Sequence, residues 1–453
     1  MADLASIDES SFFHASRRRA LGSQRLRNPW LRAFRRIVWS RLPQPLRKAV
    51  LKLVFAPRRA PLAVNAPAAQ PICVVGLLST STGIGEGGRL CGRALAALAY
   101  DVRSVDVSEL LEGTDPMRDR APLLEPGGGT VILHFNPDNL QPTLALMGRR
   151  RLRGKRIIGY WAWELPRIPD HWIGSLDHVD EVWTPSRFVA EAVRPFTAKP
   201  VRVVPHPVAL GRSGTSRRRR FGIAGQFVVL TMFTFASSFP RKNPIAAVQA
   251  FRRAFGDAAD RLLILKVSDA AEAPDEMRQL LAAIGDAPNI RVEERRLSED
   301  DRLDLIASAD VLLSLHRSEG FGLAMAEAML AGILVVATGW SGNLDFMDET
   351  SALLVPARMI EAADGRGVYG YGECWAEPDV AAAAAHLSTI AANPSRFEAM
   401  RRSALAMARE KLGIENYHKL IRGALGPALR HPARSGKPEA PAKAVARTGL
   451  QPS

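Results

Sequence analysis

The sequence is poor in cysteine and lacks any long uncharged apolar run. Three cysteines, Cys73, Cys91 and Cys374, occur in 453 residues, and their spacing matches no metal-ligand pattern. This usage indicates a reducing compartment rather than a disulfide framework. No stretch reaches the roughly 18 apolar residues that a spanning helix needs, and residues 1–10 lack an apolar signal core. We therefore expect a cytoplasmic protein without an integral membrane segment.

The strong positive charge is confined to the two ends of the chain. The formal net charge is +15 and the pI is about 10.3, which at first suggests nucleic-acid binding. Residues 1–70 carry 14 Lys/Arg against 3 Asp/Glu, and residues 426–453 carry 5 against 1, which leaves residues 71–425 neutral at 42 against 42. Because the body is neutral, we expect no nucleic-acid partner.

Residues 1–70 are expected to form a basic amphipathic extension and linker. Between 17 and 59, apolar residues such as Trp30 and Phe34 recur at helical spacing among arginines. This pattern is typical of a helix on an anionic membrane surface, although a solvated tail or a helix packed on the body would carry the same charges. A peripheral position at the inner face of the plasma membrane is therefore a hypothesis. The end, 426–453, is expected to be disordered.

Strands and helices alternate through the body, which predicts an α/β fold with two doubly wound, mostly parallel sheets. The first domain is predicted at 71–212, the second at 213–400, and a helix at 401–425 is expected to pack back toward the first domain. Strands are expected near 72–78, 102–107, 130–136, 156–160, 227–233, 261–267, 290–293, 311–315 and 333–337. The arginines at 217–220, near the boundary, are interpreted as a solvated loop.

One stretch in the second domain combines a strand, a glycine turn and a helix. Residues 311–315 form an apolar run, Glu319-Gly-Phe-Gly322 follows, and 323–330 is almost wholly apolar except for Glu327. A buried carboxylate without a partner costs several kcal/mol, so Glu327 needs either a structural partner or a ligand with hydroxyl donors. The free amides at the start of this helix suit a phosphate.

A pair of cations follows another strand of the same predicted sheet. Arg241 and Lys242 come after the strand at 227–233, and the carboxyl ends of parallel strands meet at one edge of a sheet. Two fixed cations beside helix-terminal amides suit a diphosphate. A surface loop is the other interpretation of the cations, and a salt-bridged helix residue is the other interpretation of Glu327.

The motif Glu319-x7-Glu327, with its flanking glycines, resembles the signature of retaining glycosyltransferases of family 4. Asp310, Arg241-Lys242-Asn243-Pro and Val203-Val-Pro-His206-Pro fit the same resemblance, which extends over roughly 72–423. It implies the GT-B fold, in which two Rossmann-like domains face a central cleft. It also implies a nucleotide diphosphate sugar as donor, no cofactor and no required metal.

The resemblance implies roles for individual residues. Arg241 and Lys242 would hold the diphosphate of the donor, and Glu319 would lie beside the donor sugar. The remaining donor-binding residues would be Gly83, Gly85, Gly320, Phe321, Gly322, Leu323, the ribose-binding Glu327, and Leu297 in the loop 294–297 that borders the nucleobase. We do not assign Glu319 as a covalent nucleophile, because it and Glu327 more plausibly contact different parts of one donor.

The sequence departs from the family pattern after the strand at 156–160. Many relatives have a histidine there, where this chain has Trp161-Ala-Trp163-Glu164. Glu164 could take a polar role, and the tryptophans could stack on a sugar or pack against a helix at 171–178. His134, at another strand end, is a further acceptor-side candidate, although a lone histidine is more often structural.

The expected activity is hexosyl transfer with retention from a UDP- or GDP-sugar, GDP-mannose among them. The acceptor would be a saccharide or a lipid-linked saccharide of surface polysaccharide synthesis. Three other functions are considered: a sugar-nucleotide-binding scaffold without turnover, a nucleic-acid-binding protein and a dehydrogenase. The glycine spacing between 83 and 88 fits the dinucleotide fingerprint poorly, which argues against the last.

Overall fold

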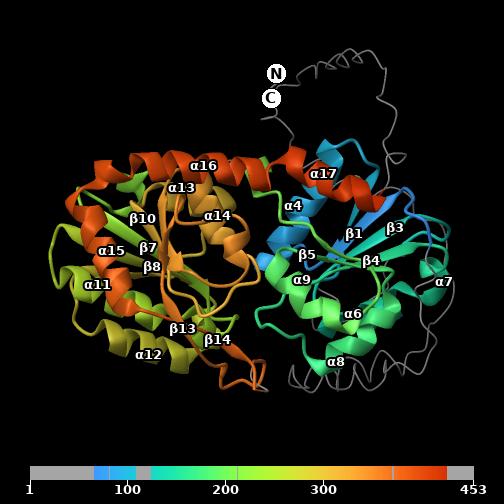
Figure 1. Ribbon diagram of the computed structural model, residues 1–453, viewed down its shortest axis with the longest axis horizontal. Helices are drawn as coiled ribbons and strands as arrows, with labels where there is room; N and C mark the ends of the chain where they lie inside the picture. Colours follow the sequence, from blue (N-terminus) through green and yellow to red (C-terminus); the bar gives the residue numbers. More distant parts are fainter. Residues whose placement is uncertain (1–65, 81, 109–123, 212, 370–371, 426–453) are drawn as a thin grey trace, which may run out of the picture. The chain divides into compact units, whose positions relative to one another are not determined.

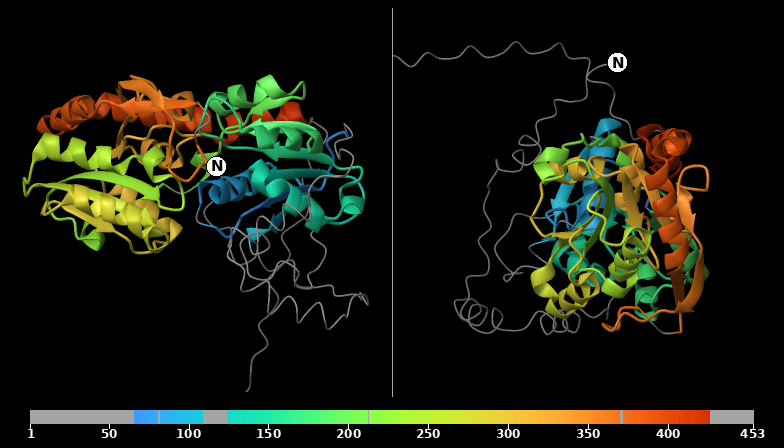
Figure 2. Two further views of the ribbon diagram at one scale, coloured as in Figure 1. Left: turned by 90° about the horizontal axis from the view of Figure 1, so that it is seen from below. Right: turned by 90° about the vertical axis from the view of Figure 1, so that its left-hand side faces the viewer.

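The computed structural model describes residues 66–80, 82–108, 124–211, 213–369 and 372–425. The predicted membrane-binding extension, 17–59, and the predicted disordered end, 426–453, lie outside these residues. Two parallel six-stranded sheets form the body, with helices on the faces of each (Figures 1 and 2). This confirms the predicted α/β class. Among the described helices, none has the length and apolarity that a membrane crossing needs.

The first sheet has the strand order β2-β1-β3-β4-β5-β6. Residues on alternate sides of each strand enter different cores: Val75 and Leu133 face one, Val74 and Ile132 the other. Parallel strands buried on both faces read as continuous apolar runs, which is why the sequence showed them clearly. The strands are β1 (Ile72–Gly76), β2 (Val102–Asp106), β3 (Thr130–His134), β4 (Arg156–Tyr160), β5 (Glu181–Thr184) and β6 (Val201–Val203).

The helices that accompany this sheet are mostly short. Its best-defined helix, α4, crosses from β1 to β2 and buries Cys91, Ala94 and Leu95. The predicted helix at 171–178 is divided into a single α-helical turn and a 3-10 turn at Gly174–His178. The α-helices are α4 (Gly83–Ala97), α6 (Leu140–Met147), α7 (Arg149–Leu152), α8 (Asp170–Ile173) and α9 (Arg187–Val193).

The second sheet has the strand order β12-β11-β10-β7-β8-β9. This is the doubly wound order of dinucleotide-binding folds, with the reversal of strand order between β7 and β10. In such sheets ligands bind outside the carboxyl ends of the strands at this reversal. The strands are β7 (Phe227–Thr234), β8 (Arg261–Ser268), β9 (Ile290–Glu293), β10 (Val311–Ser314), β11 (Leu334–Thr338) and β12 (Leu353–Val355).

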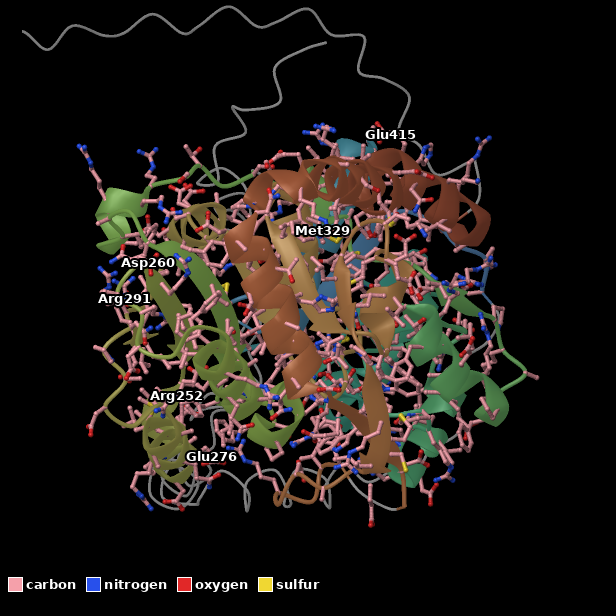
Figure 3. All side chains as sticks on the ribbon, turned by 60° about the vertical axis from the view of Figure 1, so that its left-hand side comes forward. Arg252, Asp260, Glu276, Arg291, Met329 and Glu415 are labelled. Carbon is pink, nitrogen blue, oxygen red and sulfur yellow. The ribbon has the colours of Figure 1, made fainter. Side chains whose placement is uncertain are left out.

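Helices cover both faces of the second sheet. Ala247 and Phe251 of one helix pack with Val229 on one face, while Met325 and Met329 of another pack with Leu230 on the other; Met329 is labelled in Figure 3. The helices are α10 (Phe239–Lys242), α11 (Pro244–Phe255), α12 (Pro274–Ile284), α13 (Glu299–Ala307), α14 (Leu323–Leu330), α15 (Val380–Ala392) and α16 (Glu398–Leu412).

The last described helix, α17 (Ile414–Leu425), belongs to the core of the first sheet. The single helix expected at 401–425 is divided at Gly413 into α16 and α17. Tyr417 and Ile421 pack with Val74 and Cys91, and the Tyr417 hydroxyl donates to Cys91 Sγ at 3.3 Å. The final helix therefore ties the end of the second half to the first sheet.

A short antiparallel hairpin, β13 (Ala357–Glu361) and β14 (Cys374–Pro378), was not expected from the sequence. Its connecting segment contributes Ala362 and Tyr369 to the apolar core of the first half. Arg366 of the same segment donates to Glu276 of α12, which is labelled in Figure 3. The hairpin thus contacts both halves of the body.

Candidate active site

Arg241 and Lys242 lie at the carboxyl end of β7, where the strand order reverses. Ser238 caps the short helix α10 by accepting a hydrogen bond from the Arg241 amide. Asn243 has a φ of +50° and forms the junction with α11. This left-handed residue turns the chain immediately after the two cations. The local fold therefore places both cations at the edge of the sheet that the topology marks for ligands.

The guanidinium of Arg241 is buried, with only 3% of the residue exposed. Nη1 donates to Ser318 O and Nη2 to Ser237 Oγ, each at 2.7 Å. Burial lowers the pKa of Arg241, but Tyr369 and the carboxylates of Glu164 and Glu319 outweigh burial and raise that pKa above its ordinary value. Arg241 is therefore a permanent, oriented positive charge.

Glu319 lies between the two cations. Its Oε1 accepts from Lys242 Nζ in a short contact and lies 3.4 Å from Arg241 Nη1. Burial raises the pKa of Glu319, but Lys242 and Arg241 together lower it to about 2. Glu319 is therefore ionised throughout the physiological range and partly neutralises the pair beside it.

The turn 319–322 is held by close backbone contacts. Ser341 Oγ accepts from the Glu319 amide at 2.8 Å, and Gly320 O accepts from Ser186 Oγ of the first half at 2.7 Å. Gly322 has a φ of +103°, a conformation that favours glycine, and caps α14 without a side-chain hydrogen bond. Helix α14 begins at Leu323, and no described side chain caps its first amides.

Glu327 has a structural partner in this structure. Its carboxylate is gripped by Arg302 of α13, with Nη2 at 2.9 Å from Oε1 and a second, short contact between Nη1 and Oε2. The salt-bridged interpretation therefore describes its side chain here. A carboxylate can accept further hydrogen bonds, so this pairing leaves a ribose-binding role as a proposal.

The glycine-rich segment is the first part of a helix, not a loop. Helix α4 begins at Gly83, and Thr82 caps it by accepting a hydrogen bond from the Gly85 amide. A Cβ on Gly85 would meet Leu77 O at 2.6 Å, and one on Gly83 would meet Leu323 of α14 at 3.5 Å. Gly85 therefore permits a close approach of the backbone, whereas Gly83 has room for a side chain and adjoins the candidate donor site.

Two buried histidines pack against α4 from the ends of β3 and β6. His134 stacks on Tyr160 with ring centroids 4.1 Å apart. The rings of His206 and Phe321 meet edge to face, with centroids 4.9 Å apart. Among the described residues, neither ring nitrogen of His134 has a hydrogen-bond partner. Burial lowers its pKa to about 3 despite nearby backbone groups of His134 and Ile84. Both histidines are neutral, and they connect α4, the glycine helix, with the turn 319–322.

The tryptophans after β4 belong to the core. Trp161 is fully buried and Trp163 is 5% exposed; both contact Trp172, with ring centroids at 6.2 and 4.8 Å. Of the two interpretations, packing against the segment at 171–178 is the arrangement that the structure shows. Glu164, by contrast, reaches the candidate site and lies 3.6 Å from Arg241 Nη2.

Tyr369 is a site residue that the sequence did not indicate. Its hydroxyl donates to Glu164 Oε2 at 2.8 Å, and the Arg241 guanidinium carbon lies 5.7 Å from its ring centroid. Its ring also stacks on Trp163, with the ring centroids 5.3 Å apart. Tyr369 comes from the hairpin segment, and only the fold brings it beside Arg241.

The remaining candidates lie farther from these charges. Leu297, in the loop between β9 and α13, is partly buried against the core on the α14 side of the second sheet. Arg217 and Arg220 of the expected solvated loop are exposed, and three of its arginines also form ion pairs: Arg217 with Asp304, Arg218 with Asp310 and Arg220 with Asp301. The described residues contain no group of His, Cys, Asp and Glu side chains suited to a metal ion.

The comparison with protein families decides the class of protein. Residues 186–412, half of the chain, match the family described as family 4 glycosyltransferases in conflict systems. The chain belongs to this glycosyltransferase family. The match includes both cations, both glutamates of the motif and Tyr369. Among curated protein sequences, none matches this glycosyltransferase significantly.

Solved structures with a similar fold are themselves glycosyltransferases or related synthases. A sucrose-phosphate synthase of Thermosynechococcus elongatus shares 16% identity over 78% of this chain and 98% of its own, with a TM-score of 0.57. Anabaena HepE, solved with UDP and glucose, shares 15% over 78% and 98%, with a TM-score of 0.55. The match to the pneumococcal O-GlcNAc transferase GtfA covers 66% of this chain but only 56% of GtfA, so this chain spans about half the length of GtfA. The identity is 16% and the TM-score is 0.45. At these identities the first two matches show the GT-B fold and no more.

Proposed function

We propose that this glycosyltransferase transfers a hexosyl group from a nucleotide diphosphate sugar, with retention at the anomeric carbon and without a metal ion. One observation carries the proposal. Arg241 and Lys242 meet Glu319 at the carboxyl ends of β7 and β10, beside the uncapped start of α14. Two cations and helix-terminal amides are the groups that a diphosphate requires.

The donor would span the edge of the second sheet. Its diphosphate would contact Arg241, Lys242 and the segment 320–323, and its ribose hydroxyls would donate to Glu327. The glycine helix, through Gly83 and Gly85, would approach the phosphates, and Leu297 would border the base. HepE was solved with UDP and glucose, which makes UDP-sugars the first donors to test.

In the proposed reaction the bond between the anomeric carbon and the diphosphate oxygen breaks, and its electron pair stays on that oxygen. The cations stabilise this developing charge, as preorganised charges do at a transition state. The acceptor hydroxyl attacks from the same face and gives its proton to the leaving phosphate oxygen. Glu319 positions the sugar and forms no covalent bond.

The acceptor would approach from the first half, where Glu164 and His134 lie. Trp161 and Trp163 are buried in the structure, so they would pack beneath this surface rather than contact the acceptor. The basic extension, 17–59, motivates a lipid-linked saccharide as acceptor and an anionic membrane surface as partner. Co-sedimentation with vesicles of anionic and of neutral lipid tests that extension; equal, negligible binding to both would exclude the membrane proposal.

The proposed activity is tested by a screen of UDP- and GDP-sugars. The protein is expected to bind one class, to release the nucleoside diphosphate slowly in water, and to release it faster with a saccharide acceptor. NMR of the product should show the anomeric configuration of the donor. Binding without turnover for any acceptor would favour the second candidate, a sugar-nucleotide-binding scaffold, and an inverted product would contradict the retaining mechanism.

A further inference from the structure

Arg241 is buried, and the residues that the structure describes use only part of its donor capacity. Two of its N–H groups make hydrogen bonds of 2.7 Å to Ser318 and Ser237, and Nε has no hydrogen-bond partner among the described residues. The carboxylates of Glu319 and Glu164 lie at 3.4 and 3.6 Å, beyond the 2.7–3.2 Å typical of N–H···O hydrogen bonds. A guanidinium has five donors, so several remain for a ligand.

The charges of the side chains around this guanidinium balance one another. Arg241 and Lys242 supply two positive charges, and Glu319 and Glu164 supply two negative ones. Glu319 contacts both cations and is gripped by Lys242. Glu164 comes from the other half of the chain and has Arg241 as its only ion-pair partner among the described residues. An incoming diphosphate would therefore meet Glu164 as a competitor for Arg241.

Tyr369 fixes the position of this competitor. Burial, the largest effect, raises the pKa of the phenol well above 10, so the hydroxyl is protonated and donates to Glu164 Oε2 at 2.8 Å. The ring stacks on Trp163 and lies 5.7 Å from the Arg241 guanidinium carbon. The opposite carboxylate oxygen, Oε1, then faces Arg241 Nη2. The hairpin segment thus orients a carboxylate that belongs to the other half.

We propose that Glu164, positioned by Tyr369, is the resident counterion of Arg241 and competes with the diphosphate for its guanidinium. The inference rests on the proposed function, because it assigns the diphosphate to Arg241. The loose 3.6 Å contact can be displaced by phosphate oxygens, which make shorter bonds. When the nucleoside diphosphate leaves, the carboxylate restores the charge balance of the buried cation. Glu164 therefore weakens product binding and speeds product release.

The test compares nucleoside diphosphate binding by the wild type and Glu164→Gln. The amide keeps the shape and the hydrogen bond from Tyr369 but removes the charge. We expect the Kd for UDP or GDP, whichever the wild type binds, to fall at least threefold in calorimetry. The dissociation rate measured by stopped flow should fall in the same proportion. Glu361→Gln, at an exposed position of β13, is the matched control and should leave both unchanged.

A second variant separates positioning from mere structure. Tyr369→Phe should tighten binding in the same direction but less, and its effect should shrink to within twofold in the Glu164→Gln background. Tyr417→Phe, which loses another buried hydroxyl, should not alter binding. Unchanged or weaker binding by Glu164→Gln overturns the inference alone. If the wild type binds none of UDP, GDP and pyrophosphate, the proposed function falls as well.

Discussion

Arg302 of α13 forms a bidentate ion pair with Glu327 of α14, in which Nη1 and Nη2 each donate to one carboxylate oxygen. Burial, the largest effect, raises the pKa of Glu327, and Arg302 lowers it without cancelling the rise. Two helices that follow different strands are thereby joined at the edge of the second sheet. The pair resolves why an almost wholly apolar helix contains one carboxylate.

Replacement of Arg302 by Ala should destabilise the fold strongly. Removing one partner of a buried ion pair typically costs about 3–5 kcal/mol, because the other charge is left uncompensated. We expect a loss of this size in urea unfolding at pH 7. Arg278→Ala removes a pair with Asp275 in which both side chains are largely exposed, and it should cost less than about 1 kcal/mol. Equal effects of the two variants would show that the Arg302–Glu327 pair adds nothing through burial.

Lys242→Ala should slow transfer more than it weakens donor binding. The ammonium contacts Glu319 in the structure and, in the proposed reaction, stabilises charge that develops only as the diphosphate leaves. Removing one such group commonly lowers kcat by about 100- to 1,000-fold. Steady-state kinetics with the best donor measure this, with the exposed Lys419→Ala as control. A rise in the donor KM at constant kcat would instead assign Lys242 to ground-state binding.

The sequence revealed the strands whose residues are buried on both faces of a sheet. Strands such as Ile72–Gly76 are buried on both faces and read as apolar runs. The hairpin was missed because Ala357–Glu361 is mostly exposed and shows no such pattern. The start of α4 was not predictable because each glycine costs about 1 kcal/mol relative to alanine in a helix, and contacts seen only in the fold explain Gly85, which lies against Leu77, and Gly87, which lies against His134 and His206.

The candidate site was predictable to a similar extent. The cations and Glu319 follow predicted strands, so topology alone placed them together. Arg302 and Tyr369 carried no local signal, because their roles depend on partners distant in the sequence. Glu164 was noticed only as a departure from a family pattern. Its relationship with Arg241 required the fold.

The stability that Glu319 contributes should depend on pH in a defined direction. Its pKa falls from 4.5 to about 2 on folding, so the folded state favours the ionised form. The contribution is full above about pH 5 and is lost as pH falls from 4.5 towards 2. A shift of this size corresponds to at most about 3 kcal/mol.

Urea unfolding of the wild type and Glu319→Gln at pH 7, 5 and 3.5 tests this dependence. The wild type should be more stable at pH 7, and the difference should narrow at pH 3.5. Glu361→Gln, which changes an exposed carboxyl group, should show little difference at any pH. A gap between wild type and Glu319→Gln that stays constant with pH would contradict the assigned ion pairs.

Two glycines of α4 should respond in opposite ways to the same substitution. A Cβ at Gly87 would lie 2.3 Å from His206 Cε1 and 2.8 Å from His134 Cε1, and both rings are buried. Gly87→Ala should therefore destabilise the protein by about 1–3 kcal/mol, the usual cost of overpacking. At Gly92 the nearest atom is the hydroxyl of the exposed Ser104 at 3.3 Å.

Gly92→Ala should therefore be neutral or should stabilise the helix by up to about 1 kcal/mol, because alanine has the higher helix propensity. Thermal unfolding of both variants measures the contrast. Gly87→Ala should also lower transfer activity, because displaced His206 would disturb Phe321 in the turn 319–322. If both substitutions stabilise α4 equally, Gly87 is not required to make room for the two histidines. The packing of His134 and His206 would then not explain the contact between α4 and the candidate donor site.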